Sequence, residues 1–190
     1  FTKGENKRIL AYSDSDWGQD IDTRRSTTGY VITLAGAPIS WKSKRQSTVA
    51  TSSVHAEYMA LYDTIREVVW LRTLLQEMGF PEPGPTKVYG DNQGCLAICS
   101  NLRTDSRTKH IDIKYHFNRE QVQGGTIDLE YCPTGEMVAD SLTKPTNISK
   151  YLWCRHSMGL RVVQLRGTAE GAIDTALGDA LSAARGPRLT

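Results

Sequence analysis

The sequence carries almost no net charge and lacks the segments that mark several common protein classes. Its 190 residues hold 23 Lys and Arg against 21 Asp and Glu, a formal net charge of +2. This balance excludes a strongly basic, histone-like nucleic-acid binder and an acidic disordered chain. No stretch reaches the roughly 18 apolar residues of a membrane-spanning helix, and the first residues contain no apolar signal-peptide core. We therefore expect a globular chain that is neither secreted nor membrane-inserted.

The small positive excess lies at the C-terminal end. Residues 151–190 contain five Arg and three acidic residues, whereas residues 1–150 contain 18 basic and 18 acidic residues. A body without net charge has to recognise a charged ligand through local patches rather than through a bulk field. Beyond Gly159 the sequence is rich in Ala, Gly and Arg and loses aromatic residues. We expect residues 161–190 to form an appendage, either disordered or weakly helical.

Cysteine is sparse as well, and no Cys-x-x-Cys pair occurs among positions 95, 99, 132 and 154. Cys95 and Cys99 would share one face of a helix, and with His110 and His116 nearby a zinc site is one interpretation. The tetrahedral Cys/His spacing of structural zinc sites is absent. This favours the other interpretation, in which the cysteines are buried thiols in a reducing compartment.

The pattern of apolar residues predicts three consecutive strands followed by alternating helices and strands. The strands are expected at 8–14, 28–34, 39–43, 86–90 and 126–132. The helices are expected at 52–79 (one long helix or two with a bend), 92–100, 109–122, 136–143 and 149–158. An antiparallel meander followed by strands that helices separate indicates an α/β domain with a mixed sheet.

Four carboxylates fall at strand ends or in the helices that follow strands. Asp14 ends the first strand and Asp91 the fourth, whereas Glu57 lies early in the long helix and Asp140 in the helix after the last strand. Functional residues of open α/β sheets gather at such positions. Clustered carboxylates repel one another unless cations neutralise them, and hard oxygen ligands suit Mg²⁺ or Mn²⁺. Taken singly, each acid is also compatible with a solvated surface group or a helix cap.

Seven short motifs around these acids resemble one protein family. They are YSDSDW (12–17), RSTTGY (25–30), ISWKSKRQ (39–46), SSVHAEY (52–58), DNQ (91–93), TKHIDIKYHF (108–117) and ADSLTKP (139–145). In this order they resemble the ribonuclease H domain of copia-type retrotransposon polyproteins. The resemblance implies a ribonuclease H-like fold, a five-stranded mixed sheet with helices on both faces. It divides the chain into an N-terminal junction (1–8), a ribonuclease H domain (9–160) and the appendage (161–190).

The family's activity implies a function for the four acids. It implies metal-dependent hydrolysis of the RNA strand of RNA–DNA hybrids during reverse transcription, with 5′-phosphate products. Two Mg²⁺ ions, which Mn²⁺ could replace, would bind to catalytic Asp14, Glu57, Asp91 and Asp140. Asp16 competes with Asp14 as first ligand, because residues two apart on a strand face the same side. We favour Asp14, which directly follows the apolar strand.

The resemblance also implies partners and a location. The partners would be the RNA–DNA hybrid and the reverse transcriptase domain of the same polyprotein, with no membrane and no small-molecule cofactor. The location would be a cytoplasmic virus-like particle or the nucleus. The chain does not begin with Met and is expected to be a fragment of a longer polypeptide.

Substrate contacts are expected from polar and basic side chains near the acids. The 2′-hydroxyl distinguishes RNA from DNA, and phosphates are bound by basic side chains, hydroxyls and helix N-termini. The candidates are Ser15, Asn92, Gln93, Lys42, Lys44, Arg45, Ser52, Ser53, Lys109, His110, Lys114 and His116. The alternative for the basic runs is a solvated face, and the aromatic residues of the 109–119 segment could equally face the core.

The sequence departs from the family pattern at one point, and two other functions are compatible with the same motifs. Cellular ribonucleases H often carry a His that helps product release in the loop before the last acid, whereas residues 132–137 contain none. Either Glu136 or a water fills that role, or the step is slower. A catalytically silent ribonuclease H-like module that binds nucleic acid or serves as a scaffold is the second hypothesis. A third keeps the fold but acts on DNA, as integrases and transposases do.

Overall fold

A five-stranded sheet organises residues 8–100 and 112–160, which are the residues that the computed structural model describes. The strands are β1 (Ile9–Ser15), β2 (Thr27–Leu34), β3 (Ala37–Arg45), β4 (Thr86–Gly90) and β5 (Ile127–Tyr131). The helices are α1 (Ser53–Glu77), α2 (Gln93–Ser100), α3 (Asp112–Gln123) and α4 (Ile148–Ser157), with 3₁₀ helices η2 (Thr134–Glu136) and η3 (Val138–Leu142). The appendage 161–190, most of the junction 1–8 and the start of the 109–122 helix lie outside the described residues.

The strands lie in the order β3-β2-β1-β4-β5. β2 pairs antiparallel with β1 and β3, whereas β4 pairs parallel with β1 and β5, so the sheet is mixed. Because β1 and β4 are parallel neighbours, their carboxyl ends, with Asp14 and Asp91, meet at one edge of the sheet. None of the described helices is both long enough and apolar enough to span a bilayer.

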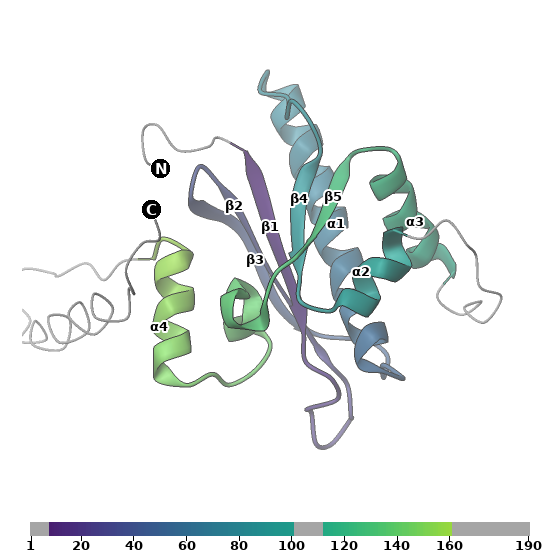
Figure 1. The fold of residues 1–190 in the computed structure, drawn as a ribbon, viewed down its shortest axis with the longest axis vertical. Helices are drawn as coiled ribbons and strands as arrows, with labels where there is room; N and C mark the ends of the chain where they lie inside the picture. Colours follow the sequence, from purple (N-terminus) through teal and green to yellow (C-terminus); the bar gives the residue numbers. More distant parts are fainter. Residues whose placement is uncertain (1–7, 101–111, 161–190) are drawn as a thin grey trace, which may run out of the picture.

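Helices cover both faces of the sheet, as the resemblance implies (Figure 1). The helices α1, α2 and α3 lie on one face, and η3 and α4 lie on the other. Ile65 and Val68 of α1 pack with Ile9, Val88 and Ile127 of the sheet in the larger core cluster. On the opposite face a smaller cluster is formed by Val31, Val138, Cys154 and Met158.

Helix α1 is a single helix of 25 residues, so the alternative with a bend is wrong. The side chain of Ser52 accepts a hydrogen bond from the His55 N–H (3.1 Å) and caps the helix. The chain leaves the helix at Gly79, whose φ of +84° is accessible to glycine at little cost. The length of α1 lets it reach from Glu57 at one end of the sheet to the loop that enters β4.

The prediction of an α-helix at 136–143 is wrong. Two 3₁₀ helices, η2 and η3, occupy the segment, and Met137 between them is extended (φ −73°, ψ 108°). The four consecutive residues from Met137 to Asp140 are all buried. An α-helix at a sheet surface buries one stripe only, so four consecutive buried side chains favour tighter, irregular turns.

The segment that contains η3 lies directly against Gly29 of β2, which leads to a stability prediction. A Cβ at Gly29 would lie 2.5 Å from Thr143 Cγ2, 3.1 Å from Leu142 Cβ and 3.3 Å from the Ala139 carbonyl oxygen. We expect Gly29→Ala to lower the free energy of unfolding by about 1–3 kcal/mol, because η3 must shift off the strand. Gly135→Ala is the matched control, since a Cβ there meets nothing within 4 Å. Equal stability of the two variants in urea denaturation would contradict this prediction.

Candidate active site

Three carboxylates from three separate elements converge at one edge of the sheet. Asp14 lies near the end of β1, Asp91 directly follows β4, and Glu57 lies just over one turn into α1. Each offers a carboxylate oxygen, and these three oxygens lie within 4.8 Å of one another. The parallel pairing of β1 with β4 sets the two aspartates side by side, and the packing of α1 on β1 adds the glutamate.

Burial and mutual repulsion make Asp14 and Glu57 unusually weak acids. Asp14 is fully buried, Glu57 is 9% exposed and Asp91 is half-buried. Burial, with a smaller contribution from the Asp140 and Asp91 charges, raises the pKa of Asp14 to about 7, although Lys144 and Thr143 act in the opposite direction. Burial, followed by the charges of Asp14 and Asp91, raises the pKa of Glu57 to about 9. The site therefore favours binding of a positive species, either protons or a cation.

Asp140 lies outside this group of three and is connected to it through Lys144. The ammonium of Lys144 is 2.8 Å from Asp140 Oδ1 and 3.7 Å from Asp14 Oδ2. Thr143 Oγ1, from the same segment, donates a hydrogen bond to Asp14 Oδ2. The second oxygen of Asp140 is 3.2 Å from the ammonium of Lys150 in α4. The segment after β5 thus supplies both an acid and two cationic neighbours to this edge.

Asp16 has a different environment from Asp14. Its carboxylate accepts a hydrogen bond from the Thr27 N–H (3.0 Å), and its own N–H donates to the Thr27 carbonyl. These contacts close the loop between β1 and β2. Of the two aspartates, Asp14 is the one placed beside Glu57 and Asp91.

The donor set at this edge fits a hard divalent cation. Asp14 Oδ1 is buried and has no hydrogen-bond partner among the described residues, so an acceptor of this carboxyl group is left unsatisfied. The three converging ligands are all carboxylate oxygens, the type that Mg²⁺ and Mn²⁺ prefer. The Ser15 N–H donates to Glu57 Oε1 (3.3 Å) and fixes the orientation of that carboxylate.

Several predicted substrate-binding residues have structural partners. Asn92 Oδ1 accepts the Cys95 N–H (2.9 Å) at the start of α2, and Ser52 caps α1. Lys42 pairs with Asp63 (2.7 Å) and Arg45 with Asp20 (2.6 Å), so two charges of the 42–45 run are neutralised within the protein. These contacts position the polypeptide around the acids.

The remaining substrate candidates differ in accessibility. Lys44, Ser53, Gln93 and His116 are exposed, whereas Ser15 is buried beside Glu57. The Lys114 ammonium lies 5.3 Å from the centre of the Tyr62 ring. Lys109 and His110 lie outside the described residues.

Cys95 and Cys99 are free thiols buried in the core on α2. The hydrogen bond to Cys99, together with burial, raises the pKa of the Cys95 thiol above its usual value, which disfavours the thiolate that zinc requires. Within residues 8–100 and 112–160, the only group of three or more His, Cys, Asp or Glu side chains with ligand atoms close enough to share a metal ion is Asp14, Glu57 and Asp91. The described residues thus favour the buried-thiol interpretation.

Four side chains that contact the acids at this edge are not among the predicted site residues. Thr143 and Lys144 belong to the 139–145 motif, and the four-residue spacing of Lys144 from Asp140 was a usable signal. Thr134 Oγ1 donates to Asp91 Oδ2 (2.9 Å), and Lys150 reaches Asp140 from α4. No local pattern relates Lys150 to an acid in another element.

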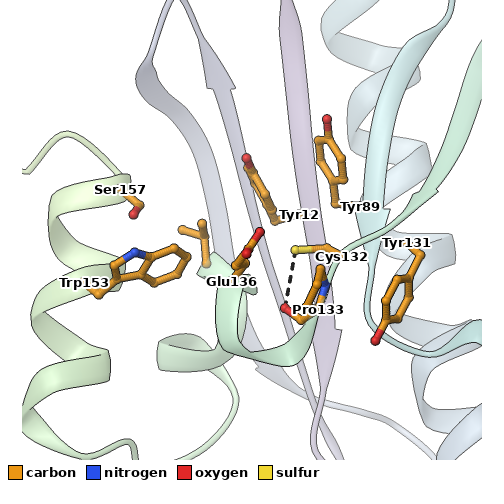
Figure 2. A pocket seen from close by; sticks show the side chains of 9 residues that line it. Tyr12, Tyr89, Tyr131, Cys132, Pro133, Glu136, Trp153 and Ser157 are labelled. Carbon is orange, nitrogen blue, oxygen red and sulfur yellow. Dashed lines mark hydrogen bonds between the residues drawn. The ribbon is translucent and has the colours of Figure 1, made fainter. Parts of the chain in front are cut away.

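A pocket of about 300 Å³ lies between α4 and the loop that follows β5 (Figure 2). The rings of Tyr12 and Tyr89 stack with centres 5.1 Å apart, and Trp153 of α4 lies across the pocket from them. Glu136 is exposed and lines this pocket. Side chains therefore leave a cavity between this loop and α4.

Sequence relatives of the chain are transposon polyproteins. The chain is 39% identical over 171 residues to the retrovirus-related Pol polyprotein from transposon RE2 of Arabidopsis thaliana, covering 90% of the chain and 12% of the relative. It is 44% identical over 143 residues to that from transposon RE1 of the same plant, covering 75% of the chain and 10% of the relative. The chain thus spans about a tenth of the length of these relatives. No protein-family model matches it.

Solved structures identify the fold. LC11 ribonuclease H1, isolated from compost, superposes with a TM-score of 0.53 at 18% identity, covering 73% of this chain and 94% of that one. The same enzyme in complex with an RNA/DNA hybrid superposes with a TM-score of 0.50, covering 72% and 94%. Together with the sequence relatives this confirms the resemblance described above: the chain belongs with the retrovirus-related Pol polyproteins of copia-type transposons, as a segment with the ribonuclease H fold.

Proposed function

We propose that the chain is a metal-dependent endonuclease that hydrolyses the RNA strand of RNA–DNA hybrids and leaves 5′-phosphate products. The observation that carries this proposal is the convergence of Asp14, Glu57 and Asp91 at the edge of a ribonuclease H fold. Further support comes from the buried Asp14 Oδ1, which has no hydrogen-bond partner among the described residues.

Asp14, Glu57 and Asp91 would hold two divalent ions, and Asp140, which shares the Lys144 ammonium with Asp14, would complete the ligand set. Divalent ions bound there would lower the pKa of a water and stabilise negative charge on the leaving oxygen. The protein's own contribution is orientation: Thr143 holds one oxygen of Asp14, and the Ser15 N–H holds one oxygen of Glu57. Thr134 does the same for Asp91. Carboxylates fixed in this way need little reorganisation when substrate binds.

Different observations support the hybrid as substrate and the polyprotein as partner. A structural neighbour was solved with an RNA/DNA hybrid, and the exposed Lys44, Ser53 and Gln93 offer phosphate and 2′-hydroxyl contacts. The sequence relatives are Pol polyproteins, which supports a reverse transcriptase domain of the same polyprotein as partner.

Replacing Asp14 tests the proposed activity. We expect Asp14→Asn to reduce hybrid cleavage in Mg²⁺ more than about 100-fold, because a direct metal ligand loses its charge. Binding to a labelled hybrid in EDTA should stay within a few-fold of the wild-type chain. Asp16→Asn is the matched control: an amide oxygen can still accept the Thr27 N–H, so cleavage should persist.

The same assays separate the proposal from its alternatives. A wild-type chain that binds the hybrid in EDTA and does not cleave it in Mg²⁺ would be the silent module, and cleavage of duplex DNA alone would indicate a DNA-directed enzyme. Equal cleavage by the Asp14→Asn and wild-type chains would refute the assignment of Asp14.

Removal of metal should make stability depend on pH through Glu57. Its pKa is about 9 in the folded chain and near 4.5 when unfolded, so the folded state binds more protons between these values. In EDTA the melting temperature should therefore fall as pH rises from about 5 to 9. Glu57→Gln should lessen this fall and melt roughly 5 °C higher than wild type at pH 8.

The control for this measurement is Glu77→Gln, which replaces an exposed acid at the end of the same helix and should follow the wild-type curve. Added Mg²⁺ should raise the wild-type melting temperature at pH 8 more than that of Glu57→Gln. Parallel pH curves for wild type and Glu57→Gln in EDTA would contradict the expectation.

A further inference from the structure

Lys150 is held in place from several directions at once. Its ammonium donates to the carbonyl oxygens of Thr134 (2.8 Å) and Gly135 (2.7 Å) and pairs with Asp140 Oδ2 (3.2 Å). It also lies 4.6 Å from the centre of the Trp153 ring, one turn along α4. The side chain is only 17% exposed, although this lysine begins a helix at the protein surface. These contacts describe a fixed group rather than a solvated surface charge.

Lys150 is connected to two of the four acids, to Asp140 directly and to Asp91 through Thr134. Asp140 is reached directly, through the ammonium. Asp91 is reached through Thr134, whose carbonyl accepts from Lys150 and whose Oγ1 donates to Asp91 Oδ2 (2.9 Å). One ammonium thus connects α4, the loop after β5, the acid on η3 and the acid that follows β4.

The loop, which contains η2, is restrained by two backbone hydrogen bonds of its own, but none of the η2 side chains is buried. Thr134, Gly135 and Glu136 are all exposed, and the pocket lined by Glu136 and Trp153 lies on its α4 side (Figure 2). A loop that core side chains do not support depends on polar contacts for its position. Lys150 supplies two such contacts to adjacent carbonyls.

We propose that Lys150 is a positioning residue that holds the 134–135 loop and Asp140 in the arrangement that binds divalent metal. This inference rests on the proposed function, because it takes the carboxylate edge to be a metal site. Lys150 would act through Asp140 and Thr134 and would not touch the ion.

Two possible roles of Lys150 predict opposite changes in Mg²⁺ affinity when the lysine is removed. If it were only a counter-charge to Asp140, its removal would leave the acids more negative and strengthen Mg²⁺ binding. If it positions the loop and Asp140, its removal should weaken Mg²⁺ binding, because outer-shell contacts orient metal ligands and typically change affinity 10–100-fold. The direction of the change therefore discriminates between the roles.

The experiment measures Mg²⁺ binding to the full chain by isothermal titration calorimetry, together with the melting temperature in EDTA and hybrid cleavage. We expect Lys150→Met to weaken Mg²⁺ binding about 10-fold. Lys150→Arg keeps the charge and several donors, so its affinity should lie between those of Lys150→Met and wild type. Thr134→Val removes only the donor to Asp91 and should weaken binding less than Lys150→Met.

Lys87→Met is the control, since it breaks an ion pair with Glu130 away from the carboxylate edge and should leave Mg²⁺ affinity unchanged. Unchanged or tighter Mg²⁺ binding by Lys150→Met would overturn the proposal, and unchanged binding by Thr134→Val would overturn the route through the loop. If Lys150→Met does not fold, Lys150→Arg and Thr134→Val decide the question. A wild-type chain that binds Mg²⁺ but does not cleave hybrids would refute the proposed function and leave the metal-positioning role standing.

Discussion

The repulsion among Asp14, Glu57 and Asp91 is the constraint on which the rest of the site depends. Three carboxylate oxygens within 4.8 Å, two of them on buried residues, are costly unless protons or cations neutralise them. The fold imposes this arrangement, because parallel pairing of β1 with β4 and packing of α1 on the sheet fix the three backbones. A large hydrophobic core on the α1 face provides the stability that offsets the cost locally. Under the proposed function, the energy that opposes the metal-free site would favour the binding of divalent ions.

The second face of the sheet restrains the segment that completes the site. Close contact at Gly29 brings η3 against β2, and Val138 packs with Val31 beneath it. Thr143 and Lys144 then reach across to Asp14, and Lys150 reaches back from α4 to Asp140. The acids on the two sides of the sheet edge are thus connected through hydroxyl and ammonium groups. Packing on both faces is required to bring these polar groups to one edge.

Local sequence patterns were sufficient for most of the fold and for the acids at strand ends. The alternation of β1 and β4 and the spacing of apolar residues in α1 report burial of one face, which is a local property. The 136–143 segment was assigned to the wrong helix type because its four consecutive buried residues reflect packing against β2, a contact distant in sequence. Lys42 and Arg45 read as a basic run, yet their partners Asp63 and Asp20 lie about 20 residues away. Long-range pairing of this kind carries no local signal.

The lysine beside the acids, Lys144, does not remove the repulsion among them. The ammonium of Lys144 contacts Asp14 and Asp140, and that of Lys150 contacts Asp140, whereas Glu57 and Asp91 are further acidic groups at the same edge. Two positive charges cannot balance four carboxylates, and the pKa of Glu57 stays near 9. A divalent ion brings twice the charge and binds oxygens in a defined geometry, which an ammonium does not impose. The near-zero net charge of residues 1–150 therefore conceals a local cluster of acids, whose mutual repulsion is relieved when protons or cations bind.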